Sequence, residues 1–289
     1  MSAFAPLTRA VRFIKDNKAK MFWLWIAYQA IKGMTTMTLI WIPLFLFWRR
    51  SGGSETFFAD WGKLVAALIL FVLSHAILMR PKIRTGLETR LGRPVFLAAY
   101  SALSLGLFGW LLFETVMAPI VSLWPPHPAL HGVGFALIIF GVLSIALGAG
   151  LPNPASIFGG KAETFTDEPG ALRVTRHPVL FGLFFWGLGH VLANGTLAFL
   201  IFFGSQAVFA LLGAAIMDRR YRKSVEEEAW ARARAVTSFF PDILSLPKGL
   251  MRTPDLARRL GVALIAIALL IALHPLVFGV SPLSSMAGG

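Results

Sequence analysis

The feature that most constrains this chain is a series of apolar runs, each close to the length of a helix that crosses a lipid bilayer. A spanning α-helix needs about 20 mostly apolar residues at a rise of about 1.5 Å per residue. The runs cover residues 22–48, 63–79, 95–120, 131–150, 179–192, 197–217 and 261–280. They predict an all-α fold, a polytopic membrane bundle of about seven transmembrane helices.

The composition agrees with this class. Hydrophobic residues make up 56% of the 289 positions, charged residues make up 14%, and the mean hydropathy is +0.70. The chain has no cysteine. Disulfides, thiolate ligands and thiol nucleophiles are therefore excluded, and any metal or haem must be held by His, Met, Tyr or carboxylate side chains.

Basic residues outnumber acidic ones, 27 to 14. They gather mostly in the connections between apolar runs, which indicates attraction to membrane lipids and not to nucleic acid. Alternate connections carry no Lys or Arg, so we predict a multi-pass protein of a bacterial inner membrane with a cytoplasmic N-terminus. Arg49 and Arg50 are the exception, because they would then face outward.

Two connections, 151–177 and 218–259, are long enough to do more than join helices. We expect the second to form a polar helix on the membrane surface, anchored by Trp230, Phe239 and Phe240. A solvated linker helix is the alternative.

Signatures of common soluble enzymes are absent from the sequence. It contains no phosphate-binding glycine loop with Lys, no G-x-S-x-G, no H-E-x-x-H and no paired carboxylates within a span. Ordinary hydrolysis therefore has little support.

Two histidines lie inside apolar runs, where a polar side chain indicates function by default. His75 stands five residues before Arg80, and His190 stands thirteen residues beyond His177, so the helical rise places them at depths of about 7 and 20 Å. His274 falls nearer the depth of His190. Imidazole is a usual axial ligand of haem, although a hydrogen bond to a neighbouring helix is the simpler role.

A third polar feature precedes the run at 179–192. Pro178 suits a first helical position, which leaves Arg176 and His177 beside the positive end of a helix. Such a place suits a carboxylate, a phosphate or a haem propionate. Simple anchoring to lipid headgroups is the alternative.

With these segments in view the chain resembles the NnrU family, and within it most closely the membrane zeta-carotene isomerases of oxygenic phototrophs. The resemblance runs from about residue 64 to 276. The segments that carry it are Ser74-His75, Leu91-Gly92-Arg93, Tyr100-Ser101, Val174 to Pro178, Trp186 to His190, Asn194-Gly195, Asp218-Arg219-Arg220, Thr237-Ser238 with Pro241, and His274-Pro275-Leu276.

The resemblance implies a haem b held between His75 and His190, with His274 as a substitute. It implies that Arg176 and His177 bind propionates or act on the ligand. The family's alternative cysteine ligand falls on Gly187, so a Cys/His ligand switch cannot occur here.

We further expect Asp218 and Arg219 to close the cytoplasmic mouth of the site. The substrate would be lipophilic or a small gas. The activity would be redox-gated isomerisation of a polyene, as in carotenoid biosynthesis, or nitrogen-oxide chemistry, as in denitrification.

The expected organisation has three parts: residues 1–60, with a basic segment and a first span outside the resemblance; the membrane domain, 61–280; and a tail, 281–289. Two other functions stay open. The stretch around Arg176 and His177 is similar to that of membrane methyltransferases that bind S-adenosylmethionine and act on isoprenylcysteine or small thiols. A non-catalytic assembly or transport factor is the other.

Overall fold

The computed structural model describes residues 54–156 and 158–283, with side chains from residue 60 onward. The expected first span and Arg49–Arg50 lie outside the described residues. The chain divides into two compact units, residues 1–66 and 67–289. The described residues form helices and connections with two isolated β-bridges, and the account below concerns those of the second unit.

Five helices in the described part of the chain are long and apolar enough to cross a membrane. A sixth apolar helix, α8, has 17 residues, so it extends over only about 26 Å. The predicted helical membrane protein is confirmed, but the described residues give five candidate spans and not seven. The long helices are α4 (Ser54–Leu78), α6 (Arg93–Met117), α7 (Pro128–Gly148), α9 (Leu197–Ser224) and α12 (Leu256–Phe278), and α8 is Pro178–Asn194.

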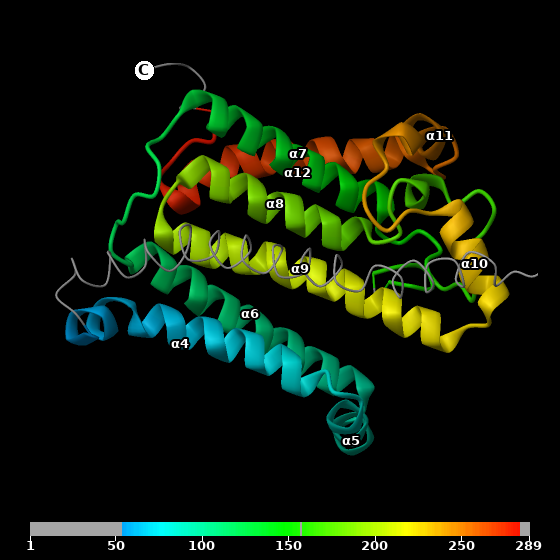
Figure 1. The fold of residues 1–289 in the computed structure, drawn as a ribbon, viewed down its shortest axis with the longest axis horizontal. Helices are drawn as coiled ribbons and strands as arrows, with labels where there is room; N and C mark the ends of the chain where they lie inside the picture. Colours follow the sequence, from blue (N-terminus) through cyan, green and yellow to red (C-terminus); the bar gives the residue numbers. More distant parts are fainter. Residues whose placement is uncertain (1–53, 157, 284–289) are drawn as a thin grey trace, which may run out of the picture. The chain divides into compact units, whose positions relative to one another are not determined.

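Within the second unit, α8 lies between α7 and α9, while α12 packs against α7 and α6 against α9 (Figure 1). A tight turn after Asn194 joins α8 and α9 as a helical hairpin. Gly195 ends α8 in the left-handed conformation, with φ of 64°, which favours glycine because it lacks a Cβ atom. Its backbone N–H donates to the carbonyl oxygen of Val191, and α9 starts two residues later.

Glycines set the distance between α7 and α8. They recur every seven residues, as Gly134, Gly141 and Gly148 on α7 and as Gly182 and Gly189 on α8. A Cβ atom at Gly134 would lie 2.5 Å from the backbone oxygen of Gly189, and one at Gly141 would lie 2.6 Å from that of Gly182. The two backbones are therefore in direct contact, as in other membrane helix pairs that use small residues.

Helices α8 and α9 meet in the same way at Gly187. A Cβ atom there would lie 2.7 Å from the backbone oxygen of Phe203 and 3.2 Å from the Cβ atom of Ala207. Because backbone atoms of α9 fill this space, the position accepts only glycine without a shift of one helix.

An arginine of α12 holds the end of α7. The Nη1 group of Arg259 donates to the carbonyl oxygens of Ala146, Leu147 and Ala149, at 3.2, 3.2 and 2.7 Å. The last carbonyls of a helix have no partner within it, and the negative end of the helix dipole favours a cation. This contact fixes the start of α12 beside the end of α7.

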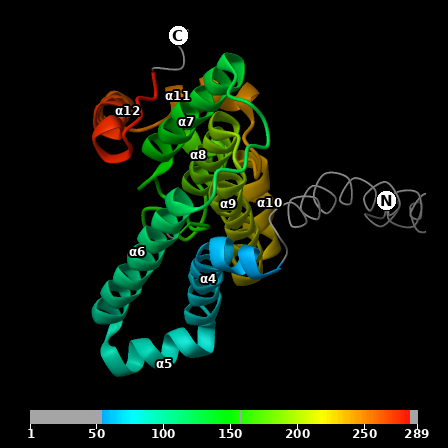
Figure 2. The ribbon, with the colours of Figure 1, turned by 90° about the vertical axis from the view of Figure 1, so that its left-hand side faces the viewer.

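The two long connections, 149–177 and 225–255, fold together at one end of α7, α8, α9 and α12, which we name the connection end (at the right of Figure 1). Figure 2 views these helices from their other end. The shorter elements there are η2 (Gly170–Arg173), α10 (Glu227–Val236), η3 (Ile243–Ser245) and α11 (Leu246–Met251), and α5 (Pro81–Leu91) joins α4 to α6. The predicted single polar helix over 218–259 is wrong, because α9 continues to Ser224 and three shorter elements follow it.

A small hydrophobic core stabilises the connection end. It includes Leu151, Phe165, Leu172, Tyr221 and Trp230, all buried. The expectation that Trp230 anchors the protein in the membrane interface is wrong for this reason. Among the three expected anchors, Phe240 has a largely exposed side chain, with an exposed fraction of 66%.

Candidate functional site

Arg176, His177 and Asp218 form one polar cluster at the start of α8. The guanidinium of Arg176 donates to both carboxylate oxygens of Asp218, from Nε at 2.5 Å and from Nη2 at 3.0 Å. Nε2 of His177 lies 3.0 Å from Oδ1 of the same carboxylate. An ionised carboxylate only accepts hydrogen bonds. Nε2 of His177 therefore carries the proton and donates this hydrogen bond to Oδ1 of Asp218.

The chain before α8 is held in place by the chain after α10. The backbone N–H of Arg176 donates to the carbonyl oxygen of Ser238 at 2.8 Å, and the hydroxyl of Thr175 donates to that of Phe239 at 2.9 Å. The backbone N–H of Asp242 donates to the carbonyl oxygen of Val174 at 2.8 Å. These bonds position the cluster from two segments more than 60 residues apart.

Two further contacts complete this support. Asn153 donates through Nδ2 to the carbonyl oxygen of Arg176 at 2.8 Å. The hydroxyl of Ser245 donates to Asp242 at 2.6 Å, and this bond holds the pKa of the Asp242 carboxyl below its ordinary value. Asp242 therefore stays ionised while its backbone anchors Val174.

Aromatic rings cover the charged cluster. The Arg176 guanidinium lies 5.4 Å from the ring centroid of Trp230 and 5.6 Å from that of Phe239. The rings of His177 and Phe239 meet edge to face at 5.5 Å. Arg176 is 4% exposed and His177 is 1% exposed, so the ion pair is removed from water, where charge–charge interactions are strongest.

One atom of the cluster lacks a partner. Nδ1 of His177 is fully buried and makes no hydrogen bond within the described residues. An unpaired buried polar atom costs about 1–3 kcal/mol. No side chain caps the start of α8 either. The start of α8 therefore has an imidazole nitrogen without a partner among the described residues, next to the positive end of the helix dipole.

Arg219 does not join this cluster. It follows Asp218 on α9, but its side chain is exposed and makes no ion pair within the described part of the chain. Successive residues of a helix point in directions about 100° apart. The structure therefore brings together Arg176, His177 and Asp218, whereas Arg219, which was expected beside Asp218 at the mouth of the site, lies outside the cluster.

His75 lies on α4 among aromatic rings. Its imidazole contacts Tyr100 and Phe209, with centroid distances of 5.5 and 5.3 Å. Nδ1 lies 2.8 Å from the carbonyl oxygen of Phe71. A carbonyl oxygen only accepts, so Nδ1 carries the proton, and Nε2 makes no hydrogen bond with a described residue.

His190 has a similar environment on α8. Its ring stacks on Phe203 of α9 at a centroid distance of 4.3 Å and an angle of 17°. Nδ1 lies 2.8 Å from the carbonyl oxygen of Trp186. On α12, Nδ1 of His274 lies 2.7 Å from the carbonyl oxygen of Val280, and His190 and His274 are close enough to interact electrostatically.

His75 and His190 contact α9 at two separate places. The two rings contact Phe209 and Phe203, which lie about 9 Å apart along α9 and about 120° apart around it. Axial nitrogens must each lie within about 2 Å of the same iron. The pair implied by the family resemblance stays a prediction.

Several supporting residues were not anticipated from the sequence. Asn153, Trp230 and Phe239 each contact Arg176, although none stands near it in the chain. Trp230 and Phe239 had been assigned to the membrane surface because their connection is amphipathic. The pattern of one segment does not say whether its aromatic face meets lipid or another connection.

The architecture and the buried cluster define a polytopic helical membrane protein with a built polar site at one end of its helices. The model of the NnrU protein family matches residues 63–282. The chain therefore belongs to the NnrU family. No curated protein matches it, and no solved structure does.

Proposed function

We propose that this NnrU-family protein is a membrane enzyme in which His177 moves a proton on a lipophilic, unsaturated substrate. One observation carries the proposal: His177 is buried, Asp218 binds its Nε2, and its Nδ1 has no partner within the described residues. An imidazole held by a carboxylate on one side and free on the other is the arrangement of a general acid and base.

The other two residues have positioning roles. Asp218 fixes the ring of His177, selects the tautomer with the proton on Nε2, and stabilises the imidazolium that forms when Nδ1 takes a proton. Arg176 holds the carboxylate through two hydrogen bonds, so Asp218 cannot rotate away. Proton transfer at Nδ1 then needs only a substrate atom within hydrogen-bond distance.

The substrate class follows from the surroundings. The helices that lead to the cluster are apolar, and much of their surface is exposed, which suits a molecule dissolved in the bilayer. Because Nδ1 of His177 is buried, the aromatic rings that cover the cluster must move to admit the substrate. His177 first takes a proton from solvent at Nδ1 and becomes an imidazolium, which Asp218 stabilises. Transfer of that proton to a polyene carbon weakens the double bonds and permits rotation, and return of the proton from the same carbon to Nδ1 restores them. This step isomerises a substrate without oxidation or reduction.

Turnover in heavy water tests this function. We expect the purified, full-length protein in liposomes to convert a cis-polyene of the carotene class and to place solvent deuterium on it, because Nδ1 exchanges its proton. His177→Gln should lower the rate at least a hundredfold, the lower end of a general acid–base contribution. Chromatography of the isomers and mass spectrometry of the product measure both effects.

The matched control is His127→Asn. His127 caps α7 by accepting from the backbone N–H of Ala129, a role that asparagine also fills, so this variant should keep the wild-type rate. Isomerisation without deuterium would rule out proton transfer. Saturable binding of S-adenosylmethionine that depends on Arg176 and His177 would instead favour the methyltransferase.

Haem b binding is a second proposal, and it has its own support. Nδ1 of His75, of His190 and of His274 each bonds a backbone carbonyl, which is how histidines that bind a metal through Nε2 are usually oriented. His190 with His274 is the pair that we propose, since helical rise places these two at similar depths.

An absorption spectrum of the detergent-solubilised protein tests the haem. We expect a b-type Soret band that His190→Ala and His274→Ala each abolish and that His75→Ala leaves in place. Loss of the band in His75→Ala and not in His274→Ala would restore the ligand pair implied by the family resemblance. A protein purified from haem-supplied cells without the band would contradict the haem proposal for either pair.

A further inference from the structure

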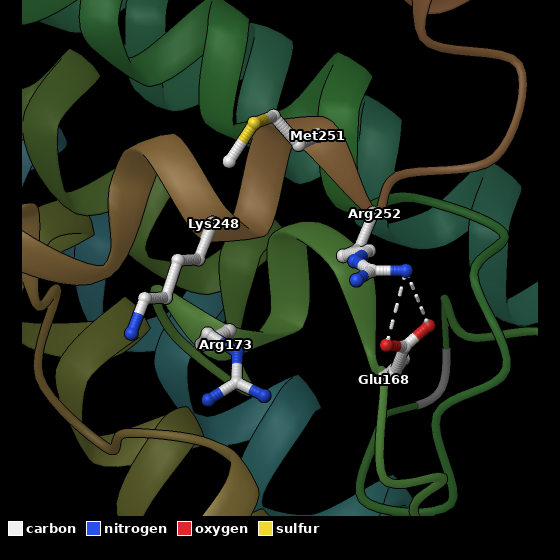
Figure 3. A pocket seen from close by; sticks show the side chains of 5 residues that line it. All are labelled: Glu168, Arg173, Lys248, Met251 and Arg252. Carbon is white, nitrogen blue, oxygen red and sulfur yellow. Dashed lines mark hydrogen bonds and ion pairs between the residues drawn. The ribbon is translucent and has the colours of Figure 1, made fainter.

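A basic pocket lies at the connection end, apart from the His177 cluster. It has a volume of about 390 Å³ and forms where α11 packs on η2. Figure 3 shows the side chains that line it, which are Glu168, Arg173, Lys248, Met251 and Arg252.

Two glycines let α11 approach η2 and so build this pocket. A Cβ atom at Gly249 would lie 3.2 Å from the backbone oxygen of Gly170. Gly170 has a φ of 63°, and a Cβ atom there would lie 3.1 Å from the carbonyl oxygen of Arg252. Thr253 is buried beside them and donates to the carbonyl oxygen of Gly249 at 2.7 Å. The close packing of the α11 and η2 backbones therefore fixes the backbone positions from which Arg173, Lys248 and Arg252 extend.

The pocket holds more positive than negative charge. Arg252 pairs with Glu168 at 3.2 Å, and both side chains are largely exposed, so water screens this pair. Among the described residues, the Arg173 side chain bonds only the carbonyl oxygen of Asp167, at 3.3 Å. Lys248 makes no ion pair within the described residues. Three cations and one carboxylate leave an excess of two positive charges to bind an anion.

Exposed apolar side chains lie on α11 and on the segment just before it, and we name them the apolar collar; Met251 is the one that also lines the pocket. Phe240, Ile243, Leu244 and Met251 are 66, 68, 93 and 74% exposed. Water disfavours such a group of side chains, whereas the boundary between headgroups and acyl chains accepts them. Because α12 begins at Leu256, five residues after α11 ends, this boundary lies close to the pocket.

We propose that the pocket binds the phosphate of an anionic phospholipid headgroup, with Arg173 and Lys248 as the principal contacts. The excess of positive charge fits a phosphodiester. The apolar collar of Phe240, Ile243, Leu244 and Met251 fits the acyl chains of the same lipid, which a soluble phosphate lacks. Binding fixes α11, and with it the segment that supports the His177 cluster, against the membrane.

Native mass spectrometry of the full-length protein tests the site. The protein is taken from nanodiscs of phosphatidylcholine with a minor share of phosphatidylglycerol, and the lipids that remain bound are counted. We expect the wild type to retain one phosphatidylglycerol. Arg173→Gln/Lys248→Gln should bind it at least about tenfold more weakly, since each basic residue near the surface contributes to anionic lipid binding.

The matched control is Arg222→Gln/Lys223→Gln. It removes the same charge from two exposed residues at the connection end, outside the pocket, and should retain the lipid. Equal loss in the control would show general attraction to anionic lipid and overturn the site. The single variant Lys248→Gln changes only an exposed side chain, so its lipid binding tests the site even where the double variant does not fold.

Inorganic phosphate distinguishes a lipid from a soluble ligand. We expect phosphate to displace phosphatidylglycerol only weakly, because it makes no contact with the apolar collar. Displacement by phosphate at concentrations comparable to those of the lipid would overturn the lipid assignment. None of these readouts depends on activity at His177 or on haem.

Discussion

Asp218→Ala is expected to lower the stability of the folded protein by about 3–5 kcal/mol, the usual cost of leaving a buried charge without its partner. Arg176 is 4% exposed, and removal of the carboxylate takes away both of its ionic hydrogen bonds. Nε2 of His177 loses its partner in the same step. The apparent Tm in detergent should fall by roughly 10 °C or more.

A second variant separates the unpaired charge from the loss of contacts in general. Arg176→Met/Asp218→Leu removes both charges together, and a buried ion pair replaced by apolar residues is often tolerated. We therefore expect the double variant to unfold at a higher temperature than Asp218→Ala. If the double variant unfolds at the same temperature as Asp218→Ala or below it, the unpaired charge of Arg176 is not the cause of the lost stability.

Gly141→Ala is expected to destabilise the protein, and Gly109→Ala is expected to leave it unchanged or slightly more stable. A Cβ atom at Gly141 would lie 2.6 Å from the backbone oxygen of Gly182, whereas none of the described atoms lies within 4 Å of one at Gly109. Both substitutions raise helix propensity by up to about 1 kcal/mol. At Gly141 the collision between two backbones should cost about 1–3 kcal/mol, and leucine there should separate α7 from α8.

Thermal unfolding of the two alanine variants, followed by circular dichroism in one detergent, measures the difference. Because both variants replace glycine with alanine, the test is whether the unfolding temperature falls in Gly141→Ala and does not fall in Gly109→Ala. The size of either change matters less. A loss of stability at Gly109 as large as that at Gly141 would mean that helix packing is not the cause.

The membrane class could be predicted because it depends on local composition. Each apolar run after the first corresponds to a described helix, and the start of α8 at Pro178 places Arg176 and His177 at a helix terminus. A proline in the first turn marks the start of a helix, and this signal can be recognised from the local sequence without knowledge of tertiary contacts. The family resemblance added Asp218, which lies more than 40 residues away in the chain.

Two kinds of feature could not be predicted from the sequence. They are the side of a neighbouring helix that a residue faces and the contacts between segments that are distant in the chain. Helical rise gives the depth of His75 and His190, but it does not say which side of α9 each one faces. Trp230 is an aromatic residue of the kind that anchors proteins in membranes, yet it packs into the hydrophobic core of the connection end and lies 5.4 Å from the Arg176 guanidinium. The glycines of α7 recur every seven residues, a pattern visible in the sequence that would have indicated the contact with α8.

Gly187 ties the evolution of α8 to that of α9. The position is closed by the main chain of α9 at Phe203, so a side chain introduced there, as in Gly187→Cys, would have no room until the two helices moved apart. Any residue larger than glycine would therefore require coordinated changes on both helices.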